Sequence, residues 1–202
     1  GGRKVHQSDE IWEIKNALRT RAFWYITFGT CIALFGSTTV SSHLALFLQD
    51  AGFTALFSAS VLGVTGVAGI IGRVLAGILG DRIEPRLILL VGLILELASF
   101  IVLLNANGTA LAYSFAVLYG LGFGFAFVAA TTVIANYFGP LVYATLFGVG
   151  ALVGTVFGGA GPILSGMSYD KLGSYQTAFY GYVAVGSIVI IPVPKEKKGD
   201  TR

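Results

Sequence analysis

Charged residues are the first thing that this sequence has little of. Only 11% of its 202 residues are charged, 55% are hydrophobic and the mean hydropathy is +0.80. A soluble domain carries about 25% charged residues, so this chain has too little polar surface to cover a globule in water. The net charge of +3 is also too small to indicate a nucleic-acid partner. We therefore expect a membrane protein that contacts the lipid bilayer directly.

Reactive and metal-binding side chains are scarce too. The single cysteine, Cys31, lies in an apolar run, which excludes a disulfide framework. We find no metal-ligand spacing and no nucleophile–base pair, and the glycine-rich stretch GLGFGF lies inside an apolar span, where a phosphate loop does not occur. The sequence predicts no metal, no cofactor and no enzyme, since a membrane enzyme needs clustered His, Asp or Cys at the membrane surface.

The N-terminal segment lacks the features of a secretory signal. It reads GGRKVHQSDEIWEIKNALRTR, which is polar and of mixed charge. The only methionine is Met167, so we expect a fragment of a longer protein. Removal of a methionine ahead of Gly1 is the alternative.

Long apolar runs are what the sequence does contain. A helix of about 20 apolar residues crosses a ~30 Å hydrocarbon layer, and the runs and their short Gly-, Pro- and Asn-containing joins predict six such helices. We expect the spans at 22–48, 55–80, 87–105, 110–137, 142–168 and 175–193. This divides the chain into a cytoplasmic segment 1–21, a transmembrane domain 22–193 and a cytoplasmic tail 194–202. The predicted class is an all-α membrane protein.

The distribution of lysine and arginine predicts the orientation of the spans. With both termini in the cytoplasm, 11 of the 13 basic residues lie on the inside, Lys171 lies outside and Arg73 lies within the membrane. Because cytoplasmic loops are enriched in basic residues, we expect a multi-pass cell-membrane protein with cytoplasmic N- and C-termini.

The second and fifth spans share an internal repeat. Residues 64–82 and 153–171 are identical at seven of nineteen positions at an offset of 89, including a shared G-x4-G-x3-D ending followed by a basic residue. Copies that lie three spans apart have opposite directions in the membrane. We therefore expect a 3+3 inverted repeat, the arrangement of each six-helix half of a major facilitator transporter.

Particular stretches resemble the major facilitator superfamily. GRVLAGILGDRIEPR is similar to the cytoplasmic loop signature after the eighth helix, and NALRTRAFW to the start of the seventh. HLALFLQDAGF, ANYFG and GAGPILSGMSYDKLGSYQTAF resemble the monocarboxylate transporter-like and oxalate/formate antiporter-like branches. The resemblance extends over about residues 16 to 193. It implies that the six spans are helices 7 to 12, and that an N-terminal six-helix half of the same transporter is missing.

Two departures from the family pattern affect the loops. Glu84 and Pro85 replace the small residue that is common in the loop signature. The stretch FGPLVYATLFG lacks a basic pair that often follows the tenth helix. Neither departure changes the expected fold.

Arg73 is the charge that composition explains least. At 1.5 Å per residue it lies about 12 Å along a helix from Asp81, the first residue of the cytoplasmic loop. An intramembrane arginine normally faces a wet cavity or a counter-charge. Resemblance to organic-anion transporters implies that Arg73 binds a substrate carboxylate through its guanidinium fork. The alternative is a structural arginine that holds the helix–loop corner.

Two further residues are candidates for proton coupling. His43 resembles a histidine of monocarboxylate transporter-like members, and its imidazole can carry a proton or bind substrate. An interfacial histidine that bonds a neighbour is an equally good interpretation. Glu96, ten residues beyond Arg86, is protonated or paired because it lies near mid-membrane. Since the ninth helix is peripheral in the family, we favour a polar packing contact for Glu96 over a relay with Arg73.

An aromatic wall is the remaining candidate for substrate contact. Tyr119, Phe123 and Phe127 recur every four residues and share one helix face. Resemblance implies that this helix lines the cavity, where Tyr119 and Phe123 contact the organic part of a small acid and Phe147 contributes from the next helix. Packing is the alternative for such a stripe.

Two other groups are predicted to be architectural. Gly150, Gly154 and Gly158 have the G-x3-G spacing that lets transmembrane helices approach closely. Asp81, Arg82 and Arg86 are expected to form a cytoplasmic latch between helix ends that breaks and reforms during transport, although the positive-inside rule accounts for part of this cluster.

We expect a secondary carrier that moves a small organic anion, such as a monocarboxylate, by alternating access, with proton coupling or anion exchange. A proton-driven exporter of a hydrophobic drug or metabolite is the second hypothesis. It predicts acids along the path, and only Glu96 qualifies. A channel or a membrane enzyme fits the sequence less well.

Overall fold

The computed structural model describes residues 12–190, and all regular secondary structure in that range is helical. The seven helices are α1 (Ile14–Ala17), α2 (Arg21–Asp50), α3 (Ala55–Gly80), α4 (Pro85–Leu104), α5 (Thr109–Phe138), α6 (Pro140–Leu172) and α7 (Gln176–Ile190). The predicted all-helical class is confirmed. The short α1 was not predicted from the sequence.

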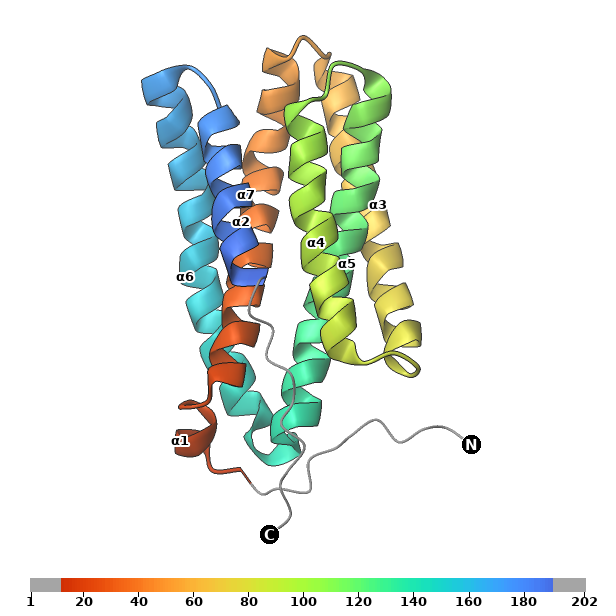
Figure 1. The fold of residues 1–202 in the computed structure, drawn as a ribbon. Helices are drawn as coiled ribbons and strands as arrows, with labels where there is room; N and C mark the ends of the chain where they lie inside the picture. Colours follow the sequence, from red (N-terminus) through yellow and green to blue (C-terminus); the bar gives the residue numbers. More distant parts are fainter. Residues whose placement is uncertain (1–11, 191–202) are drawn as a thin grey trace.

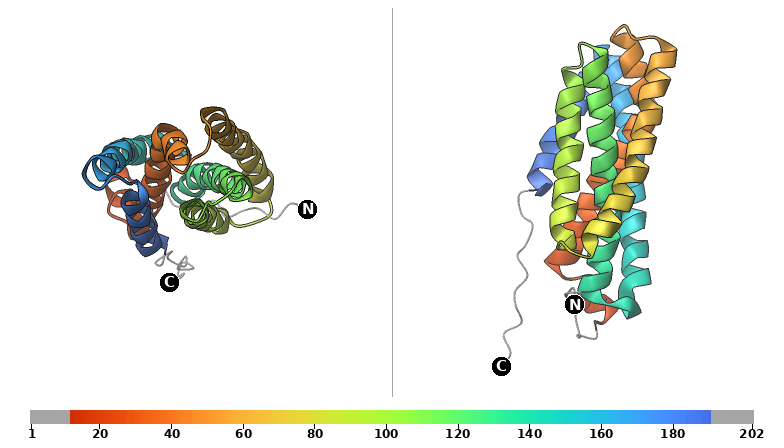
Figure 2. Two further views of the ribbon diagram at one scale, coloured as in Figure 1. Left: turned by 90° about the horizontal axis from the view of Figure 1, so that it is seen from above. Right: turned by 90° about the vertical axis from the view of Figure 1, so that its right-hand side faces the viewer.

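The long helices run up and down in two groups. Figure 1 shows α2, α6 and α7 on one side and α3, α4 and α5 on the other, and the view from above in Figure 2 separates the same groups. Within them, α5 packs most extensively against α3 and α4, while α2 packs most extensively against α6. Helix α2 also contacts α3 and α5, which joins the two groups.

Helices α2 to α6 are each long and apolar enough to cross a membrane. Large apolar side chains are exposed along them, including Leu56 at 84% and Val156 at 68%, which suits lipid contact rather than water. Helix α7 is described as far as Ile190, so the end of the last expected span and the tail 194–202 lie outside the described residues. The structure is that of a multi-pass membrane protein.

Local sequence explains where the helices begin and end. The Thr20 and Thr54 hydroxyls accept hydrogen bonds from backbone N–H groups in the first turns of α2 and α3. Gly139, with a φ of +79°, separates α5 from α6, and Gly173 ends α6 in the left-handed conformation at a φ of +65°. Helix α6 therefore continues four residues beyond its predicted end at 168.

Glycines set the separation of the packed helices. A methyl group on Gly72 of α3 would lie 2.8 Å from the carbonyl oxygen of Leu121 on α5. A methyl group on Gly161 of α6 would lie 2.8 Å from the carbonyl oxygen of Phe35 on α2. Backbones approach this closely only where no side chain intervenes, which is how helices associate where lipid replaces water.

Candidate functional site

Arg73 lies on an exposed face of α3, two turns from the loop that follows the helix. Its guanidinium carbon is 5.7 Å from the ring centroid of Phe123 and 5.5 Å from that of Phe127, both on α5. These distances fit cation–π contacts, which hold the side chain against an aromatic surface without neutralising it. Among residues 12–190, Arg73 forms no ion pair. The structure therefore presents a cation on an apolar, aromatic surface.

The aromatic row on α5 leads from the core to this exposed face. Tyr119 is buried, with 4% of its surface exposed, while Phe127 is 42% exposed. Tyr119 and Phe123 stack with centroids 6.3 Å apart, and Phe123 lies 6.1 Å from Phe127. Residues four apart share a helix face, so the predicted stripe forms as one continuous row. Phe123 and Phe127 contact Arg73, whereas Tyr119 faces the core.

His43 lies near the end of α2, away from this row. Its Nε2 is 3.0 Å from the carbonyl oxygen of Pro162 on α6, and its ring centroid is 5.2 Å from that of Tyr175. Because a carbonyl only accepts hydrogen bonds, Nε2 is the donor in this contact, and Nδ1 is buried with no hydrogen-bond partner among the described residues. The structure does not bring His43 into contact with Arg73.

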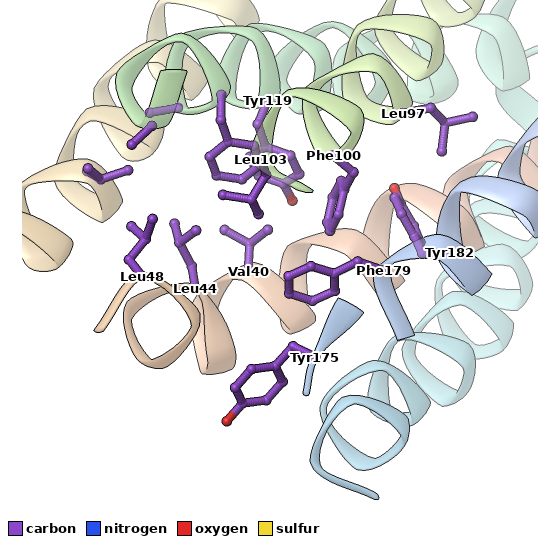
Figure 3. Close-up of a cluster of buried hydrophobic side chains, with 14 of the residues drawn as sticks. Val40, Leu44, Leu48, Leu97, Phe100, Leu103, Tyr119, Tyr175, Phe179 and Tyr182 are labelled. Atoms are coloured by element: carbon purple, nitrogen blue, oxygen red, sulfur yellow. The ribbon is translucent and has the colours of Figure 1, made fainter. Parts of the chain in front are cut away.

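Glu96 lies on α4 and is completely buried. Its Oε1 accepts a hydrogen bond of 3.1 Å from the hydroxyl of Tyr182 on α7, while Oε2 has no partner within the described part of the chain. Figure 3 shows Tyr182 and Tyr119 on either side of Phe100 in the largest core cluster. Glu96 therefore does not line the exposed face that carries Arg73.

The remaining predicted residues lie at helix contacts and ends. Phe147 is 38% exposed on α6 and stacks on Tyr143 of the same helix, with no contact to the Arg73 group among the described contacts. The three packing glycines face α2: Gly150 lies beside Thr27, and Gly154 and Gly158 lie beside Leu34.

The expected cytoplasmic latch maps onto the turn between α3 and α4. Asp81 is the C-terminal cap of α3, and the Arg82 N–H donates to the carbonyl of Leu79. Arg86 Nε forms an ion pair with Glu84 Oε1 at 2.7 Å. Glu84, which departs from the family signature, thus has a structural role in this turn.

Two contacts were missed at the sequence level. Thr38 on α2 donates a hydrogen bond of 2.5 Å to the carbonyl oxygen of Gly158 on α6, and Tyr182 donates to Glu96. The sequence did contain a signal for the Gly158 contact, because Pro162 has no N–H and leaves the Gly158 carbonyl without its helical donor. Nothing in the sequence specified that Thr38 would supply the replacement.

Comparison with known proteins is consistent with this architecture. Residues 26–201 match the profile of the Major Facilitator Superfamily. The chain is 32% identical over 161 residues to monocarboxylate transporter 13 of Rattus norvegicus, an alignment that covers 75% of this chain and 37% of the relative. It is 29% identical over 190 residues to monocarboxylate transporter 13 of Bos taurus, covering 90% of this chain and 44% of the relative.

The chain thus spans less than half the length of these curated relatives. The match to the family extends over most of the chain, from early in α2 through all the later helices. The resemblance expected from the sequence motifs is confirmed. The chain belongs to the major facilitator superfamily of membrane transporters, and within it is similar to monocarboxylate transporters.

Proposed function

We propose that this chain is the C-terminal six-helix half of a major facilitator carrier that moves a small organic anion, a monocarboxylate in the first instance, by alternating access. The other half would supply the opposite wall of the substrate cavity. Both termini of the chain are assigned to the cytoplasm, as the distribution of basic residues predicts. Coupling is to protons or to a counter-transported anion.

Matching helix contacts support a 3+3 inverted repeat. Gly72 and Gly161 are equivalent at the sequence offset of 89. Gly72 faces the carbonyl of Leu121, and Gly161 faces the carbonyl of Phe35, and these two partners are separated by 86 positions. The contact of α3 with α5 is thus repeated by the contact of α6 with α2.

A second pair of contacts follows the same offsets. A methyl group on Gly69 would lie 3.7 Å from the carbonyl oxygen of Gly120, and one on Gly158 would lie 3.4 Å from that of Leu34. Two consecutive contacts in the same register are more than glycine-rich composition alone predicts. They favour an internal duplication of three helices, with α2 to α4 equivalent to α5 to α7.

The observation that carries the proposed function is the unpaired, exposed guanidinium of Arg73. A cation within the membrane is costly unless it faces water, a ligand or a counter-charge. Arg73 has no acidic partner among the described residues, and its aromatic neighbours leave its N–H groups available. A substrate carboxylate fits this fork through two parallel charge-assisted hydrogen bonds.

The surrounding side chains complete the proposed site. Phe123 and Phe127 offer an apolar surface for the organic part of the substrate, and Tyr119 continues that surface inward. Phe147 and His43 are assigned to substrate contact in other steps of the cycle, since neither touches Arg73 here. Asp81, Arg82 and Arg86 are assigned to a cytoplasmic latch that opens as the two halves rock.

The direct test is transport by the complete carrier in proteoliposomes. Replacing Arg73 with glutamine removes the charge and the fork, and we expect uptake of lactate and pyruvate to fall at least about tenfold, since a hydrogen bond to a charged group contributes about 1.5–3 kcal/mol. Arg73→Lys keeps the charge but not the fork, so we expect partial activity.

Arg19→Gln is the matched control, because Arg19 is exposed in the turn before α2 and its loss changes the net charge equally. Normal uptake by Arg73→Gln would refute the assignment of Arg73. A carrier that moves hydrophobic cations and no monocarboxylate would favour the exporter hypothesis. The 202-residue chain tested alone should be inactive unless two copies pair, which size-exclusion chromatography detects.

A further inference from the structure

Glu96 is a buried acid with one bonded and one unbonded oxygen. The Tyr182 hydroxyl donates to Oε1 at 3.1 Å, and Oε2 finds no hydrogen-bond partner in residues 12–190. Buried polar atoms are nearly always paired, so an unpaired oxygen on a fully buried side chain requires an explanation. A purely structural role for Glu96 provides no such explanation, because a glutamine at this position would pack equally well without an ionisable group.

Three other helices enclose this carboxyl. A methyl group on Gly36 of α2 would lie 2.7 Å from Glu96 Oε1 and 2.6 Å from the Tyr182 hydroxyl. A methyl group on Gly122 of α5 would lie 2.7 Å from the Glu96 backbone nitrogen. The two glycines are separated by 86 positions, the offset that relates α2 to α5 in the other contacts. Glu96 thus lies where the two groups of helices meet.

In the described part of the chain, the titratable groups nearest to the Glu96 carboxyl are two tyrosines. Tyr182 of α7 donates to the carboxyl, and Tyr119 of α5 lies in the same core cluster as Tyr182. The buried Tyr119 hydroxyl, like Glu96 Oε2, has no hydrogen-bond partner among the described residues. Phe100 lies between the two tyrosines, 6.0 Å from Tyr119 and 4.4 Å from Tyr182 by ring centroids (Figure 3).

No basic side chain of residues 12–190 forms an ion pair with Glu96. A carboxylate without a counter-charge is unfavourable in such dry surroundings, so the enclosed state holds the neutral acid. If the helices separate and water enters, the free-energy cost of the ionised carboxylate falls. The site is therefore able to bind and release one proton as its surroundings open and close.

Resting on the proposed monocarboxylate transport, we propose that Glu96 is the proton-binding site that couples transport to the pH gradient. Water on one side of the membrane supplies a proton to Oε2 of the ionised carboxylate, giving the carboxylic acid, and the proton returns to water on the other side. Tyr119 belongs to the same α5 row as Phe123, which contacts Arg73. The row therefore connects the proton site with the face that binds substrate.

Replacement of Glu96 by glutamine separates coupling from binding. The amide keeps the oxygen that accepts from Tyr182 but cannot ionise. At one unit of imposed pH gradient, a wild-type symporter with one proton per monoanion accumulates lactate about tenfold, because one pH unit corresponds to about 1.36 kcal/mol. We expect E96Q in the complete carrier to lose this accumulation while retaining lactate–lactate exchange at equal pH, measured with labelled lactate in proteoliposomes.

Ser99→Ala is the matched control. Ser99 is buried on the same helix and bonds the backbone carbonyl of Glu96, so this variant perturbs the same place without touching the carboxyl. We expect it to keep the gradient-driven accumulation. If E96Q does not fold, Glu96→Asp provides the test: it must keep accumulation but show a displaced pH profile, since its shorter side chain loses the contact with Tyr182.

The outcomes distinguish this inference from the proposed function. Accumulation by E96Q equal to that of the wild type, or an unchanged pH profile of Glu96→Asp, overturns the assignment of Glu96. The assignment is also overturned if His43→Gln loses gradient-driven accumulation while E96Q keeps it. That result would place the proton site at His43, near the end of α2. A wild-type carrier that transports no monocarboxylate refutes the proposed function itself.

Discussion

Gly72 and Gly77 lie on the same helix but have different surroundings. A methyl group on Gly72 would meet the Leu121 carbonyl oxygen at 2.8 Å and the Leu121 Cα at 3.0 Å, whereas one on Gly77 would meet nothing within 4 Å. We expect Gly72→Ala to destabilise the protein by about 1–3 kcal/mol, because the contacting atoms are backbone and cannot move aside. Gly77→Ala should be neutral or slightly stabilising, since alanine favours helix.

Thermal unfolding in detergent measures both changes. The comparison controls for helix propensity, since both substitutions are the same and both lie in α3. Equal melting temperatures for the two variants would contradict the close packing of α3 against α5.

Some of the residues of the candidate site could be predicted from the sequence, and others could not. Arg73 could be recognised because it lies within an apolar run, and a charge within the membrane has a free-energy cost that requires an explanation. The Tyr182 partner of Glu96 is 86 positions away, and the Thr38 partner of Gly158 is 120 positions away. Periodicity describes one helix at a time, so it could not specify which helices meet or at what height. Phe147 illustrates this: it was expected to contribute to the substrate cavity from the helix after the aromatic stripe, but its ring contact among the described residues is with Tyr143 of its own helix.

At the scale of elements, α6 contains a proline whose lost hydrogen bond is replaced from another helix. Pro162 cannot donate to the Gly158 carbonyl, and the Thr38 hydroxyl of α2 donates to it instead. The proposed repeat makes Arg73 of α3 equivalent to Pro162, and Arg73 has an N–H group for the Gly69 carbonyl. It makes Gly124 equivalent to Thr38, and Gly124 has no side chain that could donate. A methyl group on Gly124 would lie 2.6 Å from the Gly69 carbonyl oxygen.

This arrangement predicts coupling between Thr38 and Pro162. Thr38→Val keeps the shape of the side chain but removes the donor. We expect a loss of about 0.6 kcal/mol and at most about 1.7 kcal/mol, the average and the maximum for hydrogen bonds between membrane helices. In a Pro162→Ala background the alanine N–H satisfies the Gly158 carbonyl, so the same change should cost less. A double-mutant cycle of unfolding free energies measures the difference.

Equal costs in both backgrounds would show that Thr38 acts through packing and not through the orphaned carbonyl. Gly161, which lies against the Thr38 and Thr39 hydroxyls, makes such packing the natural competing explanation. The cycle separates the two because packing is unaffected by the N–H at position 162.

The helices themselves were largely predictable. Apolar runs bounded by turn residues placed the second span at 55–80, where α3 runs from Ala55 to Gly80. The errors lie at the ends: α6 extends to Leu172 because the first left-handed glycine that stops it is Gly173. The short α1 has four residues and no apolar periodicity. Its buried Ala17 belongs to the same core cluster as Phe138, so tertiary packing and not a local pattern accounts for this helix.

At the scale of the whole molecule, two groups of helices meet along α2 and α5. Each group is closed by glycine contacts of the same register, which supports the proposed repeat. What the sequence could not provide is the position of the two groups relative to each other, because that depends on contacts such as Gly36 against Tyr182 and Glu96 that join distant helices.

The orientation in the membrane gives the last prediction. If α2 leaves the cytoplasm, the turns before α3 and before α5 face outward, and the turn before α4 faces inward. Single cysteines introduced into the 202-residue chain with Cys31→Ser report this directly, since Cys31 is the only cysteine of these 202 residues. We expect Ala51→Cys and Asn107→Cys, both at exposed turn positions, to react with an impermeant maleimide on intact cells. Ile83→Cys, at 40% exposure, should react only after permeabilisation. The reverse pattern would place Arg82, Arg86 and the cluster before α2 outside, against the positive-inside rule.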